Sequence, residues 1–110
     1  MRKGRAAERR ALRHYRLRGY RILGTNVWAG GYELDLVARR GRQVVFVEVK
    51  SKASGRYGGA LEMVGPEKVR RIRRAAAAFL ASQPALRGLP VRFDVVAEQA
   101  GRLRRFPSAF

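Results

Sequence analysis

Cysteine is absent from the 110-residue sequence, and histidine occurs once, as His14. The absence of cysteine excludes disulfide cross-links and thiolate metal sites. His14 lies on the basic side of a predicted helix, so we interpret it as a surface residue and expect neither a Ser-His-Asp triad nor a histidine-rich zinc site. The stretch 55–59 lacks the G-x-x-x-x-G-K-[ST] pattern and gives no support for a P-loop nucleotide site.

Long hydrophobic runs are also missing. No apolar run approaches the ~18 residues that a membrane span needs. The N-terminus is basic from Arg2 onward and lacks the apolar core of a signal peptide. We therefore expect a cytoplasmic protein.

Acidic residues are scarce: 8 Asp and Glu stand against 25 Lys and Arg, which gives a net charge of +17. Of the 25 cations, 21 are arginine, whose planar fork suits phosphate oxygens. Self-repulsion at this charge opposes the compact state, and a bound polyanion would relieve it. We predict nucleic acid as the partner, with an acidic membrane surface or an acidic protein as the alternatives.

The length fits one domain, residues 1–110, and is too short for two. Hydrophobic periodicity predicts an α/β fold in the order α-β-β-β-α-β, with a mixed sheet flanked by helices. The predicted elements are a helix over 3–18, strands over 20–27, 33–39 and 43–50, a mobile loop over 51–65, a helix that begins at Pro66, a strand that begins at Val91, and a short fifth strand over 102–106.

Three of the eight acidic residues fall in the central hairpin: Glu33, Asp35 and Glu48. A two-residue type II′ turn at 41–42, with glycine first, would place Asp35 opposite Glu48 and Glu33 opposite Lys50. All four side chains would then lie on one face of the sheet. A slip of one residue would separate them.

Carboxylates held this close repel each other unless a proton, a lysine or a metal lies between them. Asp35 and Glu48 offer the oxygen ligands that Mg²⁺ and Mn²⁺ prefer. With Lys50 beside the metal, these are the parts that phosphodiester cleavage needs. The alternative is a salt-bridge ladder of Glu33 with Lys50 and of Glu48 with an arginine, and spacing alone does not decide between the two.

Glu8 is an unusual residue in the first predicted helix, because it shares the apolar stripe with Leu12 and Tyr15. An exposed glutamate at the edge of the stripe, paired with an arginine, is the alternative interpretation. Asp94 interrupts the alternation of the strand that begins at Val91, and we interpret it as a structural ion-pair partner.

The segment Val47-Glu48-Val49-Lys50, preceded by Asp35, resembles the D…E-x-K core of the PD-(D/E)XK nuclease superfamily. Nearly the whole chain resembles the YraN-like family of uncharacterised bacterial proteins (UPF0102). The matching blocks are Gly4-x-x-x-Glu8, Gly19-Tyr20-x-Ile22-Leu23, Asn26, 33–38, 45–50, Tyr57-Gly58, Lys68, 92–96 and Ala109-Phe110. The chain departs from the family pattern at Tyr32, where glycine is usual, and at Lys52, where arginine is usual.

This resemblance implies a restriction-endonuclease-like fold and, by similarity to archaeal Holliday junction resolvases, an active site of Glu8, Asp35, Glu48 and Lys50. It implies a Mg²⁺ or Mn²⁺ ion held by Asp35, Glu48 and the main-chain carbonyl of Val49. The expected activity is hydrolysis of DNA, branched DNA included. The alternative is a non-catalytic module that kept the nuclease fold and binds DNA or structured RNA.

The basic residues outside this core are candidates for phosphate contacts, with a solvated face as the alternative. They are Lys52, Arg56 and Tyr57 in the predicted loop, and Lys68, Arg70, Arg71 and Arg74 on the second helix. Trp28 and Tyr57 are candidates for stacking on exposed bases, although core packing or a hydrophobic flap would equally explain Trp28. A homodimer, with Phe106 and Phe110 as its apolar contact, is a further hypothesis.

Overall fold

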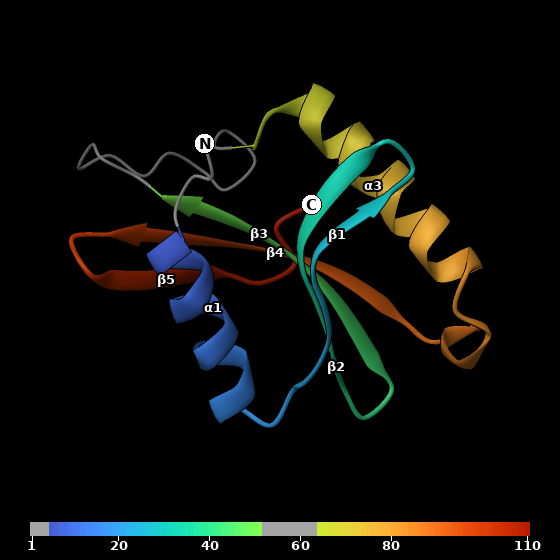
Figure 1. Ribbon diagram of the computed structural model, residues 1–110, viewed down its shortest axis with the longest axis horizontal. Helices are drawn as coiled ribbons and strands as arrows, with labels where there is room; N and C mark the ends of the chain where they lie inside the picture. The colour runs from blue at the N-terminus through green and yellow to red at the C-terminus, as the bar shows by residue number, and fades with distance from the viewer. Residues whose placement is uncertain (1–4, 52–63) are drawn as a thin grey trace.

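The computed structural model describes residues 5–51 and 64–110, which form one five-stranded sheet with a helix on each face (Figure 1). The elements are α1 (Arg5–Leu17), β1 (Arg21–Ala29), β2 (Tyr32–Arg40), β3 (Gln43–Ser51), α3 (Pro66–Ala81), the 3₁₀ turn η1 (Pro84–Leu86), β4 (Val91–Gln99) and β5 (Arg102–Phe106). The predicted element order and the mixed sheet are confirmed, and the short fifth strand is present.

The strands lie in the order β1-β2-β3-β4-β5. Only β3 and β4 run parallel, because α3 lies in the connection between them and returns the chain to the same end of the sheet. The β2–β3 turn is the predicted one: Arg40 pairs with Gln43, Gly41 has φ 60°, and Arg42 is not among the residues with positive φ. This combination identifies a type II′ turn.

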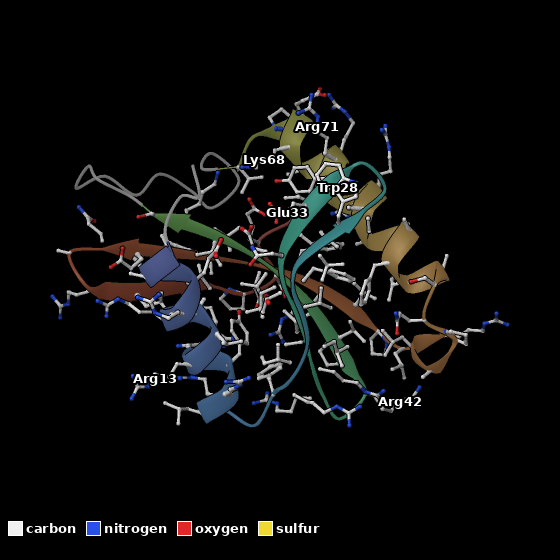
Figure 2. The ribbon with its side chains drawn as sticks, viewed as in Figure 1. Arg13, Trp28, Glu33, Arg42, Lys68 and Arg71 are labelled. Carbon is white, nitrogen blue, oxygen red and sulfur yellow. The ribbon has the colours of Figure 1, made fainter. Side chains whose placement is uncertain are left out.

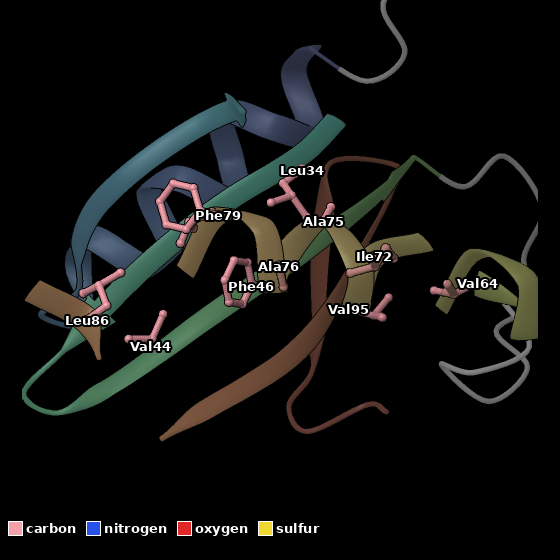
Figure 3. Close-up of a cluster of buried hydrophobic side chains, with 11 residues drawn as sticks. Leu34, Val44, Phe46, Val64, Ile72, Ala75, Ala76, Phe79, Leu86 and Val95 are labelled. Carbon is pink, nitrogen blue, oxygen red and sulfur yellow. The ribbon is translucent and has the colours of Figure 1, made fainter. Parts of the chain in front are cut away.

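Two apolar clusters lie on opposite faces of the sheet. Beneath α3, Phe46 and Val95 pack against Ile72 and Phe79 (Figure 3). Beneath α1, alternate residues of the same strands, such as Val47, join the other cluster. The central strand β3 is therefore buried on both faces.

Both helices are amphipathic, and arginines cover their outer faces. Pro66, which follows Gly65, begins α3. A proline is tolerated at this position because the first helical N–H has no intrahelical partner. Among the described residues there is no helix with the length and apolarity that crossing a membrane requires.

Asp94 is fully buried and joins four parts of the chain. It accepts hydrogen bonds from the Tyr15 hydroxyl (2.7 Å), from the Arg92 guanidinium (2.8 and 2.9 Å) and from the Ser108 amide (3.0 Å). Arg105 lies 3.5 Å away. A buried charge is tolerated when it is paired and hydrogen-bonded in this way, so the prediction of a structural ion-pair partner is confirmed.

The C-terminal aromatic rings pack on this chain's own core. Phe110 stacks on Phe93 with ring centroids 5.1 Å apart, and Phe106 is half-buried at the edge of the cluster beneath α3. Much of the apolar surface that we assigned to a homodimer contact is therefore used within the chain.

Candidate active site at the fork of the sheet

Strands β2 and β3 separate part-way along their length. Their backbone pairing runs from Arg40–Gln43 to Leu36–Val47. Beyond that point the first residues of β2 remain paired with β1, while the last residues of β3 remain paired with β4. Figure 1 shows the two strands diverging from their hairpin. We call the place where they part the fork; Asp35 is the first residue beyond it on β2, and Glu48 is the first on β3.

A change of face along β2 accompanies the fork. Leu34 and Leu36 would share a face in a regular strand, yet Leu34 packs beneath α3 and Leu36 beneath α1. Opposite this change, Asn26 of β1 has a positive φ of 51°. The strand thus rotates at Asp35, and its continuation turns away from β3.

The predicted pairing of Glu33 with Lys50 is wrong for this reason. Glu33 pairs with Trp28 of β1, and Lys50 pairs with Ala97 of β4. The predicted register holds only up to Leu36–Val47, so the predicted backbone pairing of Asp35 with Glu48 is wrong as well. A salt-bridge ladder between Glu33 and Lys50 is excluded by the same divergence.

Asp35 is held at the fork by a main-chain hydrogen bond. The Val49 amide donates to the Asp35 carboxylate at 2.8 Å, and the Asp35 side chain is 9% exposed. The carboxylate thus takes the position of a ladder partner for β3 and bridges the two separating strands. This bond holds the Asp35 side chain against Val49, the residue that follows Glu48 in β3.

Glu8 and Asp35 line one cavity of about 300 Å³, together with Val49. Glu8 comes from α1, and the Asn26 side-chain amide donates to its carboxylate at 3.5 Å. The cavity lies between α1 and the fork. Glu8 therefore faces Asp35 across an open space.

Glu48 points toward α3 and is 3% exposed. Its carboxylate lies 3.2 Å from the Lys68 ammonium and accepts a hydrogen bond from the Tyr32 hydroxyl at 3.3 Å. Lys68, which we predicted to contact nucleic acid, is thus engaged with an acidic residue of the site. The arginine partner suggested for Glu48 is replaced by a lysine.

The charges at the fork shift the pKa of their neighbours. Burial, and then the negative charge of Glu48, raise the pKa of Tyr32 to about 12, with a smaller contribution from Asp35. Burial acts to lower the pKa of Lys68, but the negative charge of Glu48 beside it outweighs burial and raises that pKa. Lys50 lies within reach of Lys68, so Lys50, Lys68 and Glu48 form one cluster on the α3 side of the fork.

The sequence profile of the uncharacterised protein family UPF0102 matches residues 7–97. The chain belongs to this family. The UPF0102 protein amb4503 of Paramagnetospirillum magneticum is 46% identical over 99% of this chain and 87% of its own length. UPF0102 proteins of Mycolicibacterium vanbaalenii and Dinoroseobacter shibae are 49% and 47% identical over 81% and 92% of this chain, and over 72% and 75% of their own lengths.

In this UPF0102 chain, Tyr32 and Asn26 contact carboxylates of the site, and neither was predicted as a site residue. The available signals were the departure of Tyr32 from the glycine of the family pattern and the place of Asn26 within that pattern. Lys52, Arg56 and Tyr57 lie outside the described residues.

The remaining predicted phosphate contacts lie on the outer face of α3, where Arg70, Arg71 and Arg74 are exposed. Glu67 forms ion pairs with Arg70 and Arg71. This partial neutralisation leaves Arg74 as the better candidate for a phosphate contact.

The donor chemistry of the fork suits a hard divalent cation, because Asp35 and Glu48 both offer carboxylate oxygens. Lys68 shows that Glu48 already attracts one positive charge. Over residues 5–51 and 64–110, no three His, Cys, Asp or Glu side chains are grouped as metal ligands. A cation here would therefore be held by Asp35, Glu48 and a main-chain oxygen such as that of Val49, with water completing the shell.

Proposed function

We propose that this UPF0102 protein is an endonuclease that hydrolyses phosphodiester bonds of DNA, branched DNA included, with Mg²⁺ or Mn²⁺ as its cofactor. The observation that carries the proposal is the fork. At the fork the backbone pairing between β2 and β3 ends, and the buried carboxylates of Asp35 and Glu48 lie beside the gap. Glu8 lines a cavity together with Asp35. A stabilising core does not require such an arrangement, because buried carboxylates are costly without compensation.

Each residue of the site has a role in this proposal. Asp35 and Glu48 hold the cation, and Glu8 faces the cavity as a further carboxylate. A bound divalent cation would polarise a phosphoryl oxygen and make a water molecule more acidic. Lys50, in the cluster around Glu48, orients the attacking water or stabilises the negative charge that develops on the phosphate.

The positive charge of the chain supports a polyanionic substrate. With a net charge of +17, phosphate contacts by exposed arginines supply affinity without reading sequence. Arg74 on α3 is one such residue. The proposal places the protein in the cytoplasm, together with its DNA substrate.

The test is a cleavage assay on labelled four-way junction, flap, single-stranded and duplex DNA, with Mg²⁺, with Mn²⁺ and with EDTA. We expect cleavage that requires the metal and that falls at least about 100-fold in Glu48→Gln, Asp35→Asn and Lys50→Met, as expected when charge stabilisation is lost. The matched control is Glu98→Gln. This residue is a glutamate of β4 that pairs with Arg10 of α1 and has no role in the proposed site, so its removal is expected to leave cleavage unchanged.

A contaminating nuclease would give equal activity in the wild type and in the three fork variants, and this outcome would reject the proposal. Circular dichroism of each variant separates loss of activity from loss of fold. Activity that survives EDTA would reject the role of the metal.

The ion pair between Lys68 and Glu48 favours a second candidate, a nucleic-acid-binding module without catalysis. In such a module the lysine neutralises the carboxylate permanently, and no cation is needed. This candidate predicts DNA or RNA binding that is unchanged by EDTA and is equal or tighter in Glu48→Gln, with no cleavage of any substrate.

A further inference from the structure

Trp28 is the one tryptophan of the chain, and its side chain is 72% exposed. Core packing, which would equally have explained this residue from the sequence, is therefore excluded. Val27 and Ala29 on either side of it pack toward α3. Because side chains alternate along a strand, Trp28 projects from the other face of the sheet, on which α1 lies.

That face also carries the cavity of the fork. Asn26, two residues before Trp28, lines the cavity with Glu8 and Asp35, and two residues along a strand span about 7 Å. Figure 2 shows Trp28 beside Glu33, its partner across the β1–β2 hairpin. The indole thus stands at the outer end of the surface that leads into the candidate active site.

A positive charge stands on the same surface. Arg9 of α1 lines the cavity together with Glu8, and Arg9 is exposed. An exposed aromatic ring and a guanidinium on one surface can together bind an unpaired nucleotide, because the ring stacks on the base and the cation contacts the phosphate. A base inside a duplex is stacked on both sides and offers no free face to the indole.

We propose that Trp28 is a base-stacking platform that makes this protein prefer DNA with unpaired bases next to the scissile phosphate. The occupant of the surface is a single-stranded segment, such as occurs at a flap or an open junction. This inference rests on the proposed function and narrows its substrate class.

The intrinsic fluorescence of Trp28 reports on this contact directly, because no other tryptophan contributes. In EDTA, which prevents cleavage, we expect a single-stranded oligonucleotide to quench the emission and a blunt duplex of equal length to leave it nearly unchanged. Binding is measured in parallel by the anisotropy of labelled DNA at one fixed ionic strength.

Variants test the contribution of the ring to affinity. Trp28→Leu should weaken single-strand binding roughly tenfold, whereas Trp28→Phe, which keeps an aromatic face, should weaken it by less than about threefold. Duplex binding should change by less than about twofold in both variants. Leu17→Ala is the matched control, since Leu17 is an apolar residue of similar exposure, 75%, at the distant end of α1, and it should leave both affinities unchanged.

The outcomes separate this inference from the proposed function. Single-strand binding without quenching, or equal losses on single strand and duplex in Trp28→Leu, overturns the base-stacking platform even if metal-dependent cleavage is observed. Quenching by single strands without cleavage in any metal keeps the platform and rejects the nuclease. Emission that changes with protein concentration in the absence of DNA shows instead that a second copy of the chain covers Trp28, and it overturns the inference.

Discussion

His14 is half-buried and lies close to two arginines, Arg18 and Arg105. Partial burial is the main cause that lowers its pKa from 6.5, the charges of Arg18 and Arg105 lower it further, and Asp94 opposes them. The Nε2 atom of His14 is buried and has no hydrogen-bond partner among the described residues. Our interpretation of His14 as a surface residue is therefore incomplete, because its ring is half-buried against Tyr15.

This environment predicts a pH dependence of stability. The unfolded chain takes up a proton at His14 near pH 6.5, whereas the native chain does so only at lower pH. Hence the free energy of unfolding should fall as the pH falls from about 6.5 toward the native pKa, and should level off below it. Urea unfolding at about pH 7.5 and about pH 5.5, for the wild type and His14→Gln, measures this contribution.

NMR of the single histidine ring gives the native pKa of His14 itself. A titration midpoint at or above 6.5 would contradict the expected direction. So would an unchanged pH slope of stability in His14→Gln.

Glu48 presents the opposite situation, a buried carboxylate with lysines close to it. In Lys68→Met the ion pair is lost, and Glu48 keeps the Tyr32 hydroxyl among its partners. We expect a loss of roughly 1–3 kcal/mol in the free energy of unfolding, the usual cost of removing one partner from a buried polar group. Lys68→Arg, which preserves the charge, should lose less.

The same variant tests whether Glu48 binds divalent cations. Without the ammonium of Lys68, Mg²⁺ should raise the melting temperature of Lys68→Met more than that of the wild type, because a ligand of the native state stabilises it. Arg71→Gln is the control, since it breaks an exposed ion pair on the same helix. A response to Mg²⁺ that is equal in all three proteins would count against cation binding by Glu48.

At the level of the elements, the sequence predicted the β2–β3 turn and the strand pairing next to it, but it did not predict where the two strands separate. The β2–β3 register follows from a two-residue turn with glycine first, because such a turn fixes which residues pair. The fork depends on Leu34 packing beneath one helix and Leu36 beneath the other, and strict alternation does not predict this. The Lys68–Glu48 ion pair could not be predicted either, because its two residues lie on different elements, α3 and β3, far apart in the sequence.

The β1–β2 hairpin carries Tyr32 and Trp28, and its tip is seated on α3. A Cβ atom at Gly30 would lie 3.1 Å from the Cα of Ala75 and 3.1 Å from the main-chain oxygen of Arg74, whereas one at Gly31 would meet nothing within 4 Å. Both glycines have positive φ, 56° and 78°. Substitution by alanine therefore strains the backbone at both positions, but it disturbs the packing on α3 at Gly30 only.

We expect Gly30→Ala to cost roughly 1–3 kcal/mol more than Gly31→Ala in the free energy of unfolding, as overpacking against a backbone usually does. Urea denaturation of the two variants measures the difference. Equal losses would show that the hairpin tip does not rest on α3 in solution.

For the molecule as a whole, the charge of +17 must be reconciled with a compact core. The one fully buried carboxylate of the described chain, Asp94, gathers Arg92 and Arg105 around itself, and it thereby ties α1 to the C-terminal strands. Among the side chains that the structure describes, the other arginines are exposed or half-buried. A fold held by this network can present many cations to solvent, and their mutual repulsion should decrease when a polyanion binds.

This distribution predicts a steep dependence of DNA binding on salt. For about six phosphate contacts, the slope of log K against log salt concentration should be roughly −5, because each contact releases about one counterion. Arg74→Gln should make the slope shallower by about 1. Arg73→Gln is the neighbouring control, because the Arg73 guanidinium lies over the rings of Phe93 and Phe110, at 5.0 and 5.6 Å. Its loss should therefore lower stability and leave the slope unchanged.

Fluorescence anisotropy of labelled DNA, measured over a series of salt concentrations, gives both slopes. If the wild-type slope were near zero, the positive charge would not be acting on phosphates, and an acidic protein surface would become the better partner for this chain. If Arg73→Gln and Arg74→Gln gave the same reduction, the outer face of α3 would act as a diffuse field of charge rather than through defined contacts. A reduction confined to Arg74 would assign this face of α3 to the DNA backbone, since only a cation that meets a phosphate releases a counterion on binding.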